Sequence, residues 1–178
     1  MKICVIGTHG VGKTTLAYEI ATEAKRQNKN AIVINEIARN CPFPLNEGFT
    51  LQGAIWIITS QINKELTAIA EKNEVIVCDR SSYDPICYLR LTNEHPKDYE
   101  KLENFAEEWM KTYEKIIFVT PSGLDIVNDG VRCINSDYQQ AIHDEFSEFC
   151  RRHPKCIYMN ASRIFSKDLQ FLFTELFK

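Results

Sequence analysis

The sequence predicts a single α/β domain built around a parallel β-sheet. Short apolar runs alternate with longer stretches of helical periodicity along the chain, and this alternation is typical of βαβ units. Glycines concentrate at the junction of the first apolar run and the first helical stretch, as expected where a strand turns sharply into a helix. With 178 residues, the chain has the length of one domain with a full hydrophobic core.

The strands and helices can be assigned in chain order. Apolar runs predict strands at 3–6, 31–34, 75–78, 116–119 and 156–159. Periodic apolar positions predict helices at 13–27, 49–72, 96–113, 138–152 and 167–177. Pro, Gly and polar residues predict loops at 39–48 and 120–136. Both loops follow strands, so we expect them at the carboxyl edge of the sheet, where ligands bind in such folds.

Composition narrows the class of protein. A formal charge of −3 and a pI near 5.8 disfavour a dedicated nucleic-acid binder. The seven cysteines contain no C-x-x-C pair, so we expect reduced thiols and neither a zinc site nor a disulfide framework. No apolar run is long enough for a transmembrane helix, and Met1 leads directly into the first predicted strand without room for a signal peptide. We therefore expect a cytoplasmic protein that does not enter a membrane.

The strongest motif lies between the first predicted strand and helix. Residues 7–14, Gly-Thr-His-Gly-Val-Gly-Lys-Thr, match the phosphate-loop pattern G-x-x-x-x-G-K-[ST]. In such a loop the backbone N–H groups and the helix N-terminus bind phosphate oxygens. Lys13 is expected to reach the β- and γ-phosphates of ATP, the Thr14 hydroxyl to ligate Mg²⁺, and His9 to serve in packing or through its backbone. The predicted nucleotide-binding residues are Gly7, Thr8, His9, Gly10, Val11, Gly12, Lys13, Thr14 and Thr15.

Two carboxylates follow neighbouring predicted strands. Asp79 ends the third strand, where a carboxylate orders Mg²⁺ or its waters, and so joins Thr14 as a predicted metal ligand. Glu36 follows the second strand and is a candidate to accept the proton of an attacking hydroxyl. The sequence leaves open which carboxylate acts as the base. Two alternatives also stay open: Asp79 as the N-cap of a helix, and Glu36 as a solvent-exposed residue at the end of a strand.

Three arginines are candidates to contact phosphate groups. Arg39 and Arg80 follow the two carboxylates and can bind substrate phosphate or hydroxyl groups through their planar guanidinium forks. They can equally form structural ion pairs with Glu36 and Asp79. Arg132 lies in the loop at 120–136 and is the candidate to close over the transferred phosphate, a plain surface arginine being the alternative.

Together these residues resemble the P-loop nucleoside and nucleotide kinases. The triplet Asp79-Arg80-Ser81 is similar to the D/E-R-S element of deoxynucleoside and thymidylate kinases. Three further segments resemble the AAA-like P-loop domains grouped with ribosylnicotinamide kinase: residues 36–39, Gln61-x-x-x-Glu65 and residues 129–132. The resemblance extends from Met1 to about Arg152.

The resemblance implies a fold and a set of roles. The implied fold is a P-loop NTPase three-layer sandwich with a five-stranded parallel sheet of order 2-3-1-4-5, formed by residues 1–178 as one domain. A lid loop over about 120–136 carries an arginine. The implied catalytic residues are Lys13, Glu36, Asp79 and Arg132, and the implied substrate-binding residues are Glu36, Arg39, Asp79 and Arg80. Adenine is expected near Asn160, because the loop after the fifth strand lies within reach of the nucleotide in this topology.

The function that follows is transfer of a phosphoryl group from ATP, with Mg²⁺, to a small nucleoside or nucleotide acceptor. One alternative is a nucleotide-dependent switch or regulatory ATPase without a separate acceptor. Another is a polynucleotide 5′-hydroxyl kinase, which the acidic pI and the lack of a basic stripe disfavour. The oligomeric state is open between a monomer and a homodimer.

Overall fold

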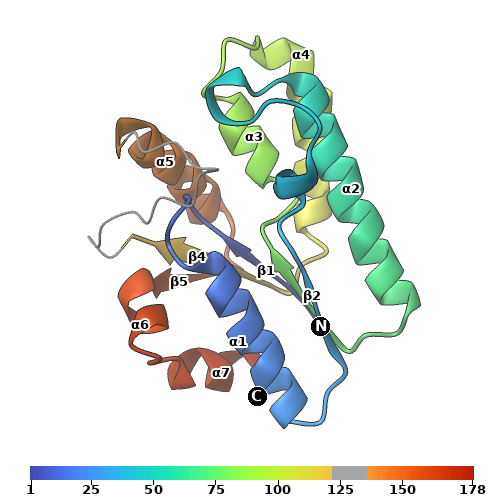
Figure 1. The fold of residues 1–178 in the computed structure, drawn as a ribbon, viewed down its shortest axis with the longest axis vertical. Helices are drawn as coiled ribbons and strands as arrows, with labels where there is room; N and C mark the ends of the chain where they lie inside the picture. The colour runs from blue at the N-terminus through green and yellow to red at the C-terminus, as the bar shows by residue number, and fades with distance from the viewer. Residues whose placement is uncertain (122–135) are drawn as a thin grey trace.

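A computed structural model describes residues 1–121 and 136–178 of the chain. Five strands form one sheet: β1 (Lys2–Ile6), β2 (Ala31–Ile34), β3 (Val75–Asp79), β4 (Lys115–Thr120) and β5 (Cys156–Asn160). All neighbouring strands are parallel, and their order is β2-β3-β1-β4-β5. The α/β class and the predicted order 2-3-1-4-5 are confirmed (Figure 1).

The register of the sheet brings the predicted strand ends together. Val5 of β1 lies beside Asp79 of β3, and Ile6 lies beside Phe118 of β4. Because the strands are parallel, their carboxyl ends meet at one edge. The residues that leave β1, β2 and β3 therefore surround a common space at that edge.

Seven α-helices lie in the described residues, and five of them correspond to predicted ones. These are α1 (Lys13–Arg26), α2 (Leu51–Ala70), α4 (Pro96–Met110), α5 (Ser136–Arg152) and α7 (Gln170–Leu176). α7 is shorter than predicted, because Lys167 takes a left-handed φ of 58° and the helix begins only at Gln170. α2 begins later than predicted, at Leu51, because the Thr50 side chain caps it by accepting from the Gly53 N–H at 3.3 Å.

The sequence did not predict two short helices. α3 (Asp84–Leu89) and α6 (Ala161–Phe165) span six and five residues, too few for a helical period to be recognised. The predicted loop at 39–48 also contains regular structure, since two short 3₁₀ helices occupy Ile37–Asn40 and Asn46–Gly48. The predicted loop at 120–136 lies outside the described residues except at its two ends.

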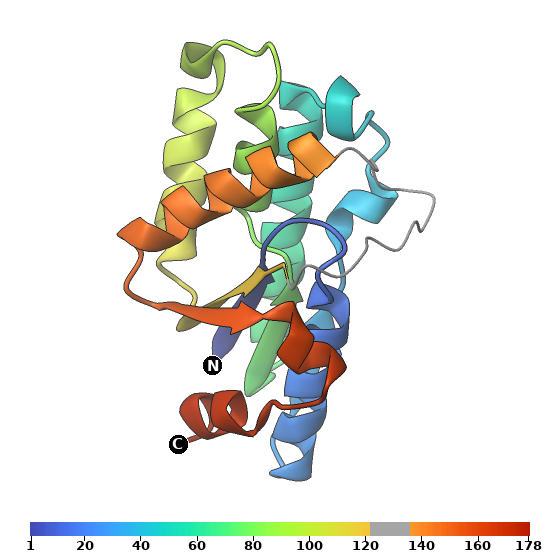
Figure 2. The same ribbon diagram turned by 90° about the vertical axis from the view of Figure 1, so that its left-hand side faces the viewer.

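Helices cover both faces of the sheet in three layers. Figures 1 and 2 show α1, α6 and α7 on one face and α2, α3, α4 and α5 on the other. Along β1, Ile3 and Val5 join the apolar cluster under the first group, whereas Cys4 and Ile6 join the cluster under the second. This alternation follows from the two-residue period of a strand, and it makes β1 buried on both faces.

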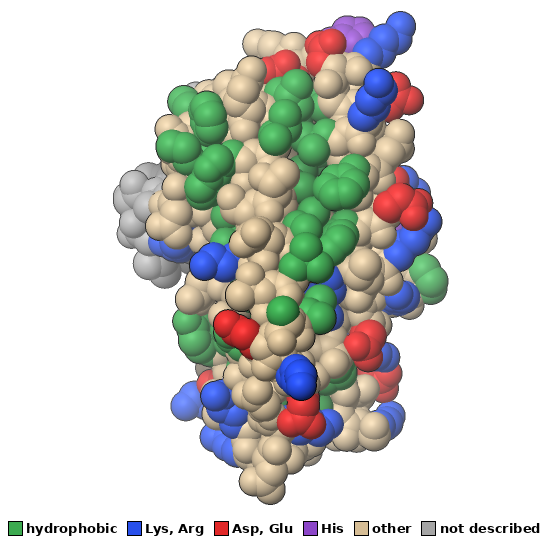
Figure 3. Space-filling model, turned by 90° about the vertical axis from the view of Figure 1, so that its right-hand side faces the viewer, with side chains coloured by type: hydrophobic (Ala, Val, Ile, Leu, Met, Phe, Trp, Pro, Cys, Tyr) green, Lys and Arg blue, Asp and Glu red, His purple; other side chains and the backbone are tan. Residues whose placement is uncertain are grey.

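The outer surface of α2 is partly apolar. Figure 3 shows apolar side chains gathered over this helix, and Ile55, Leu66 and Ile69 each expose between 43% and 51% of their surface. Within the described parts of the chain, no helix is long and apolar enough to cross a membrane.

Candidate active site at the carboxyl edge of the sheet

Residues 7–14, called the P-loop from here on, connect β1 to α1 in a tightly bent path. Gly7, Gly10 and Gly12 have φ values of 134°, 79° and 87°, which other residues rarely adopt. A side chain at Gly7 is excluded for a second reason, since its Cβ would lie 2.5 Å from the Val119 carbonyl oxygen of β4. The loop therefore owes its shape both to backbone freedom and to the close approach of β4.

The loop ends in a helix N-terminus that suits an anion. Gly12 caps α1 without any side-chain hydrogen bond, and the first turn of α1 contains no acidic residue. The first N–H groups of the helix are therefore not occupied by a capping side chain. Lys13 is 6% exposed, and its Nζ donates to the Thr8 carbonyl oxygen at 2.5 Å. Burial, reinforced by the Arg80 guanidinium, lowers the pKa of Lys13 to about 7.

The two predicted magnesium ligands lie in direct contact. The Thr14 hydroxyl donates to Asp79 Oδ2 at 2.5 Å, and Asp79 is 2% exposed at the end of β3. The described residues contain no cluster of three or more metal-ligating side chains. Mg²⁺ bound with a nucleotide needs only one or two protein oxygens in addition to phosphate, so Thr14 and Asp79 fit this ion. The N-cap alternative for Asp79 is wrong, because Tyr83 occupies the N-cap of α3.

Arg80 is the centre of an ion-pair network beside the P-loop. Its Nε donates to Glu36 Oε1 at 2.6 Å, and its Nη1 donates to Asp84 Oδ1 at 3.2 Å and to the Tyr88 hydroxyl at 3.4 Å. The Arg80 backbone has a left-handed φ of 88°, a conformation that costs a non-glycine residue about 1–2 kcal/mol. The network on both sides of the guanidinium holds the residue in this conformation.

The Glu36 carboxylate forms ion pairs with two arginines. Besides Arg80, the Arg39 Nε donates to Glu36 Oε2 at 2.9 Å. The Arg80 guanidinium is the main cause that lowers the pKa of Glu36 to about 2, with Lys13 and Arg39 contributing. Its side chain is 13% exposed, so the alternative of a solvated strand end is wrong. Of the two alternatives that the sequence left open for Arg39 and Arg80, the structure shows ion pairs: both arginines pair with Glu36, and Arg80 also pairs with Asp84, not with Asp79.

Asp84 positions the turn between β3 and α3. Its Oδ2 accepts from the Ser81 backbone N–H at 2.8 Å and from the Ser81 hydroxyl at 2.7 Å. The sequence reasoning missed this residue and α3 with it. The spacing Ser81-x-x-Asp84 followed by Pro85 is a helix-start signal that could have found both.

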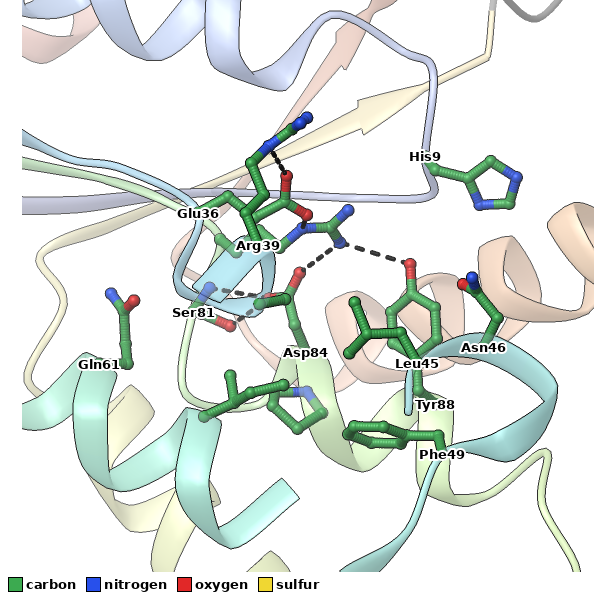
Figure 4. A pocket seen from close by; sticks show the side chains of 14 residues that line it. His9, Glu36, Arg39, Leu45, Asn46, Phe49, Gln61, Ser81, Asp84 and Tyr88 are labelled. Carbon is green, nitrogen blue, oxygen red and sulfur yellow. Dashed lines mark hydrogen bonds and ion pairs between the residues drawn. The ribbon is translucent and has the colours of Figure 1, made fainter. Parts of the chain in front are cut away.

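A pocket opens beside these residues, and we call it the edge pocket. Figure 4 shows its walls, which come from the P-loop, the segment after β2, helix α2 and the β3–α3 segment. It is lined by His9, Glu36, Ala38, Arg39, Leu45, Asn46, Phe49, Ile57, Gln61, Arg80, Ser81, Asp84, Pro85 and Tyr88. The structure thus brings together Glu36, Arg39 and Arg80 as predicted, whereas Asp79, also predicted to bind substrate, is not among the residues that line the pocket. Of the α2 residues in the wall, Gln61 belongs to a segment that the sequence resemblance included, while the aromatic residues had no sequence signal of their own.

The remaining predicted site residues have separate surroundings. His9 lines the edge pocket, and its backbone carbonyl accepts from Gln139 Nε2 of α5 at 2.8 Å, in agreement with the predicted backbone role. Asn160 caps α6 by accepting from the Ser162 backbone N–H at 2.9 Å. α6 lies close to the P-loop, since a Cβ at Gly12 would lie 3.4 Å from Phe165 Cζ. Arg132 lies outside the described residues.

Comparisons with known proteins identify the family. The family model described as "AAA domain" matches residues 2–163, so the chain belongs to this family. Its fold is the α/β fold of P-loop kinases. The deoxyadenosine kinase from M. mycoides with bound dATP has a TM-score of 0.74 and 18% sequence identity, with all of both chains covered.

A second structure of that kinase gives the same result. It is described with the products dCMP and a flexible dCDP bound, and it has a TM-score of 0.64 and 16% identity over 99% of this chain and 98% of the other. A search of the curated proteins found no match. Neither solved structure is a ribosylnicotinamide kinase, so that finer resemblance stays a prediction.

Proposed function

We propose that the protein transfers the γ-phosphoryl group of ATP, with Mg²⁺, to a nucleoside or nucleotide bound in the edge pocket. The observation that carries the proposal is the position of this pocket. It shares His9 with the P-loop and contains Glu36 and Arg80 at the same strand ends as the Thr14–Asp79 contact. A P-loop next to a partly apolar pocket is the arrangement that transfer to a small acceptor requires. The fold shared with a deoxyadenosine kinase supports the same class of acceptor.

The residues of the P-loop would hold the nucleotide. The uncapped N-terminus of α1 and the glycine backbone suit the phosphates, and the Lys13 ammonium can leave the Thr8 carbonyl to meet a phosphate oxygen. Thr14 and Asp79 together present oxygen ligands to Mg²⁺. When bound, ATP with Mg²⁺ supplies the phosphoryl group and the charge that neutralises it.

Glu36 is better suited to orient the acceptor than to remove its proton early. Its pKa of about 2 makes it a weak base, because two guanidinium groups stabilise its charge. Phosphoryl transfer passes through a loose transition state that depends mainly on positioning and charge stabilisation. We assign Glu36 to accept a hydrogen bond from the acceptor hydroxyl, with Arg80 holding the carboxylate in place.

The test is acceptor-dependent release of ADP. Nucleosides, nucleoside monophosphates and short oligonucleotides are each supplied with ATP and Mg²⁺, and the phosphorylated product is identified by mass spectrometry. We expect ADP release to depend on a nucleoside or nucleotide and to produce its phosphate. ADP release that is independent of every acceptor would establish the regulatory ATPase instead, and phosphorylation of oligonucleotides alone would establish the polynucleotide kinase.

A further inference from the structure

Behind the edge pocket lies a buried polar network that the reaction itself does not use. Gln61 of α2 lines the pocket and is 2% exposed. One helical turn later, Glu65 is fully buried, and its Oε1 accepts from Gln61 Nε2 at 2.9 Å. A buried carboxylate at this position needs partners, and the network supplies them.

Both oxygens of Glu65 are occupied. Its Oε2 accepts from Lys2 Nζ at 2.6 Å and from Trp109 Nε1 at 2.8 Å. Its Oε1 accepts from the Tyr113 hydroxyl in addition to Gln61. The Lys2 ammonium also lies over the rings of Trp109 and Tyr113, at 4.8 and 4.4 Å from their centroids. The carboxylate is therefore fixed by β1, by α4 and by the residues before β4.

This fixed carboxylate determines which end of the Gln61 amide faces the pocket. An ionised carboxylate accepts hydrogen bonds but cannot donate them. If the amide turned over, its oxygen would face a carboxylate oxygen, and a buried hydrogen bond would be replaced by repulsion. The Nε2 end is therefore held toward Glu65. Gln61 Oε1 has no hydrogen-bond donor among the described residues, and it remains for a ligand in the pocket.

A second fixed acceptor lines the same pocket. The Asp84 carboxylate is 3% exposed and is oriented by Arg80 and Ser81. Figure 4 shows Gln61, Ser81 and Asp84 along one side of the pocket. A ligand that meets this side must bring N–H or O–H donors, because an oxygen acceptor placed there would face acceptors.

We propose that Glu65 is a positioning residue that locks the Gln61 amide with its oxygen toward the edge pocket, so that the pocket selects amino-substituted over keto nucleobases. The proposal rests on the proposed function and specifies its acceptor. The exocyclic amine of adenine or cytosine carries two N–H donors, whereas hypoxanthine and uracil have a carbonyl oxygen at the corresponding position. Glu65 acts through Gln61 and does not touch the acceptor.

The test compares matched pairs of acceptors that differ in this exocyclic group and in the protonation of the ring nitrogen next to it. The value of kcat/KM is measured for deoxyadenosine against deoxyinosine and for deoxycytidine against deoxyuridine, and for their 5′-monophosphates, at saturating ATP and Mg²⁺. For the wild-type protein we expect the amino member of the preferred pair to exceed the keto member by about tenfold or more. In Glu65→Gln the side chain can donate as well as accept, so Gln61 can turn, and we expect this ratio to fall at least about fivefold.

The ratio of kcat/KM values within a pair distinguishes a positioning role of Glu65 from a general loss of structure. A purely structural role of Glu65 would lower kcat/KM for both members of a pair together and leave their ratio unchanged, which would overturn the proposal. Glu71→Gln is the matched control, because it makes the same chemical change at the exposed C-cap of α2; its ratio should equal that of the wild type. If Glu65→Gln fails to fold, Gln61→Leu removes the amide without altering a charge, and it should bring the ratio toward one.

The wild-type protein alone can also overturn the inference. Phosphorylation of both members with a ratio near one, or a preference for the keto member, contradicts it while the proposed function stands. If no nucleoside or nucleotide is phosphorylated or bound in calorimetry, the proposed function fails and this inference fails with it.

Discussion

The P-loop and the edge pocket occupy the same edge of the sheet but are assembled in different ways. The P-loop consists of eight consecutive residues, 7–14, whereas the edge pocket collects side chains from four separate segments of the chain. The P-loop presents backbone groups, a helix end and one lysine, whereas the pocket depends on ion pairs between side chains far apart in sequence. The P-loop is therefore formed by residues that are consecutive in sequence, whereas the edge pocket forms only when distant segments pack together. Each of the following changes tests that division.

The largest effect is expected from Lys13→Met, which removes the only side-chain cation of the P-loop. Without this charge the transition state loses its main stabilising contact from the loop, so we expect kcat/KM to fall by about a hundredfold or more. Steady-state kinetics with the preferred acceptor measure the fall. Lys25→Met, a change at the last turn of the same helix, should retain full activity. Equal activity of both variants would remove the P-loop from the mechanism.

Arg80→Met should damage the edge pocket and its stability together. It leaves Glu36 and Asp84 without their shared partner in a mostly buried site, a change that costs about 3–5 kcal/mol when an ion pair is fully buried. Urea unfolding measures the free energy of unfolding. Arg39→Met is the matched control, because Arg39 is 45% exposed and pairs with Glu36 from the surface, and it should cost less than about 1 kcal/mol. Similar costs for the two variants would contradict a network centred on Arg80.

Acid stability tests the charge of Glu36. Its pKa is lowered to about 2 in the folded protein, so the unfolded chain binds the proton first as the pH falls. The stabilisation, at most about 3 kcal/mol, is fully present above the ordinary glutamate pKa and is lost as the pH falls toward 2. Unfolding curves from pH 6 to pH 2 should show a shallower decline for Glu36→Gln than for the wild type. Parallel declines would place the acid-sensitive group elsewhere.

The smallest effect is expected from Asn160→Ala. The side chain caps α6, and loss of an N-cap costs about 1 kcal/mol. Thermal unfolding measures this loss, and calorimetry of ATP with Mg²⁺ measures whether the same change weakens binding. A change in stability alone limits Asn160 to capping. A loss of affinity beyond the change in stability supports the predicted position of adenine beside it.

The sequence predicted the P-loop more completely than it predicted the edge pocket. The P-loop was predictable to the residue, because its chemistry depends on glycines, a lysine and a threonine at fixed spacing between a strand and a helix. Asp79 was also predictable, because a strand end places it beside the P-loop whatever the rest of the chain does. The resemblance to P-loop kinases added the strand order.

The short helices and the pocket wall were not predictable to the same extent. α3 begins with Asp84 accepting hydrogen bonds from Ser81, and Tyr88, near the other end of that helix, accepts from Arg80. Gln61 and Glu65 form an ordinary i, i+4 pair in sequence, and nothing local indicates that Lys2, Trp109 and Tyr113 meet them.

The sequence by itself thus determined the α/β class, the P-loop and the carboxylates at the strand ends, because each rests on backbone geometry or on a period that neighbouring residues set. Only the tertiary structure decided that Arg80 joins Glu36 to Asp84 and that Glu65 orients Gln61. Arg80 and Glu36 are 44 positions apart, and the Lys2 ammonium that fixes Glu65 is 63 positions away from it. The energy of these contacts comes from burial that no single segment possesses before the layers pack.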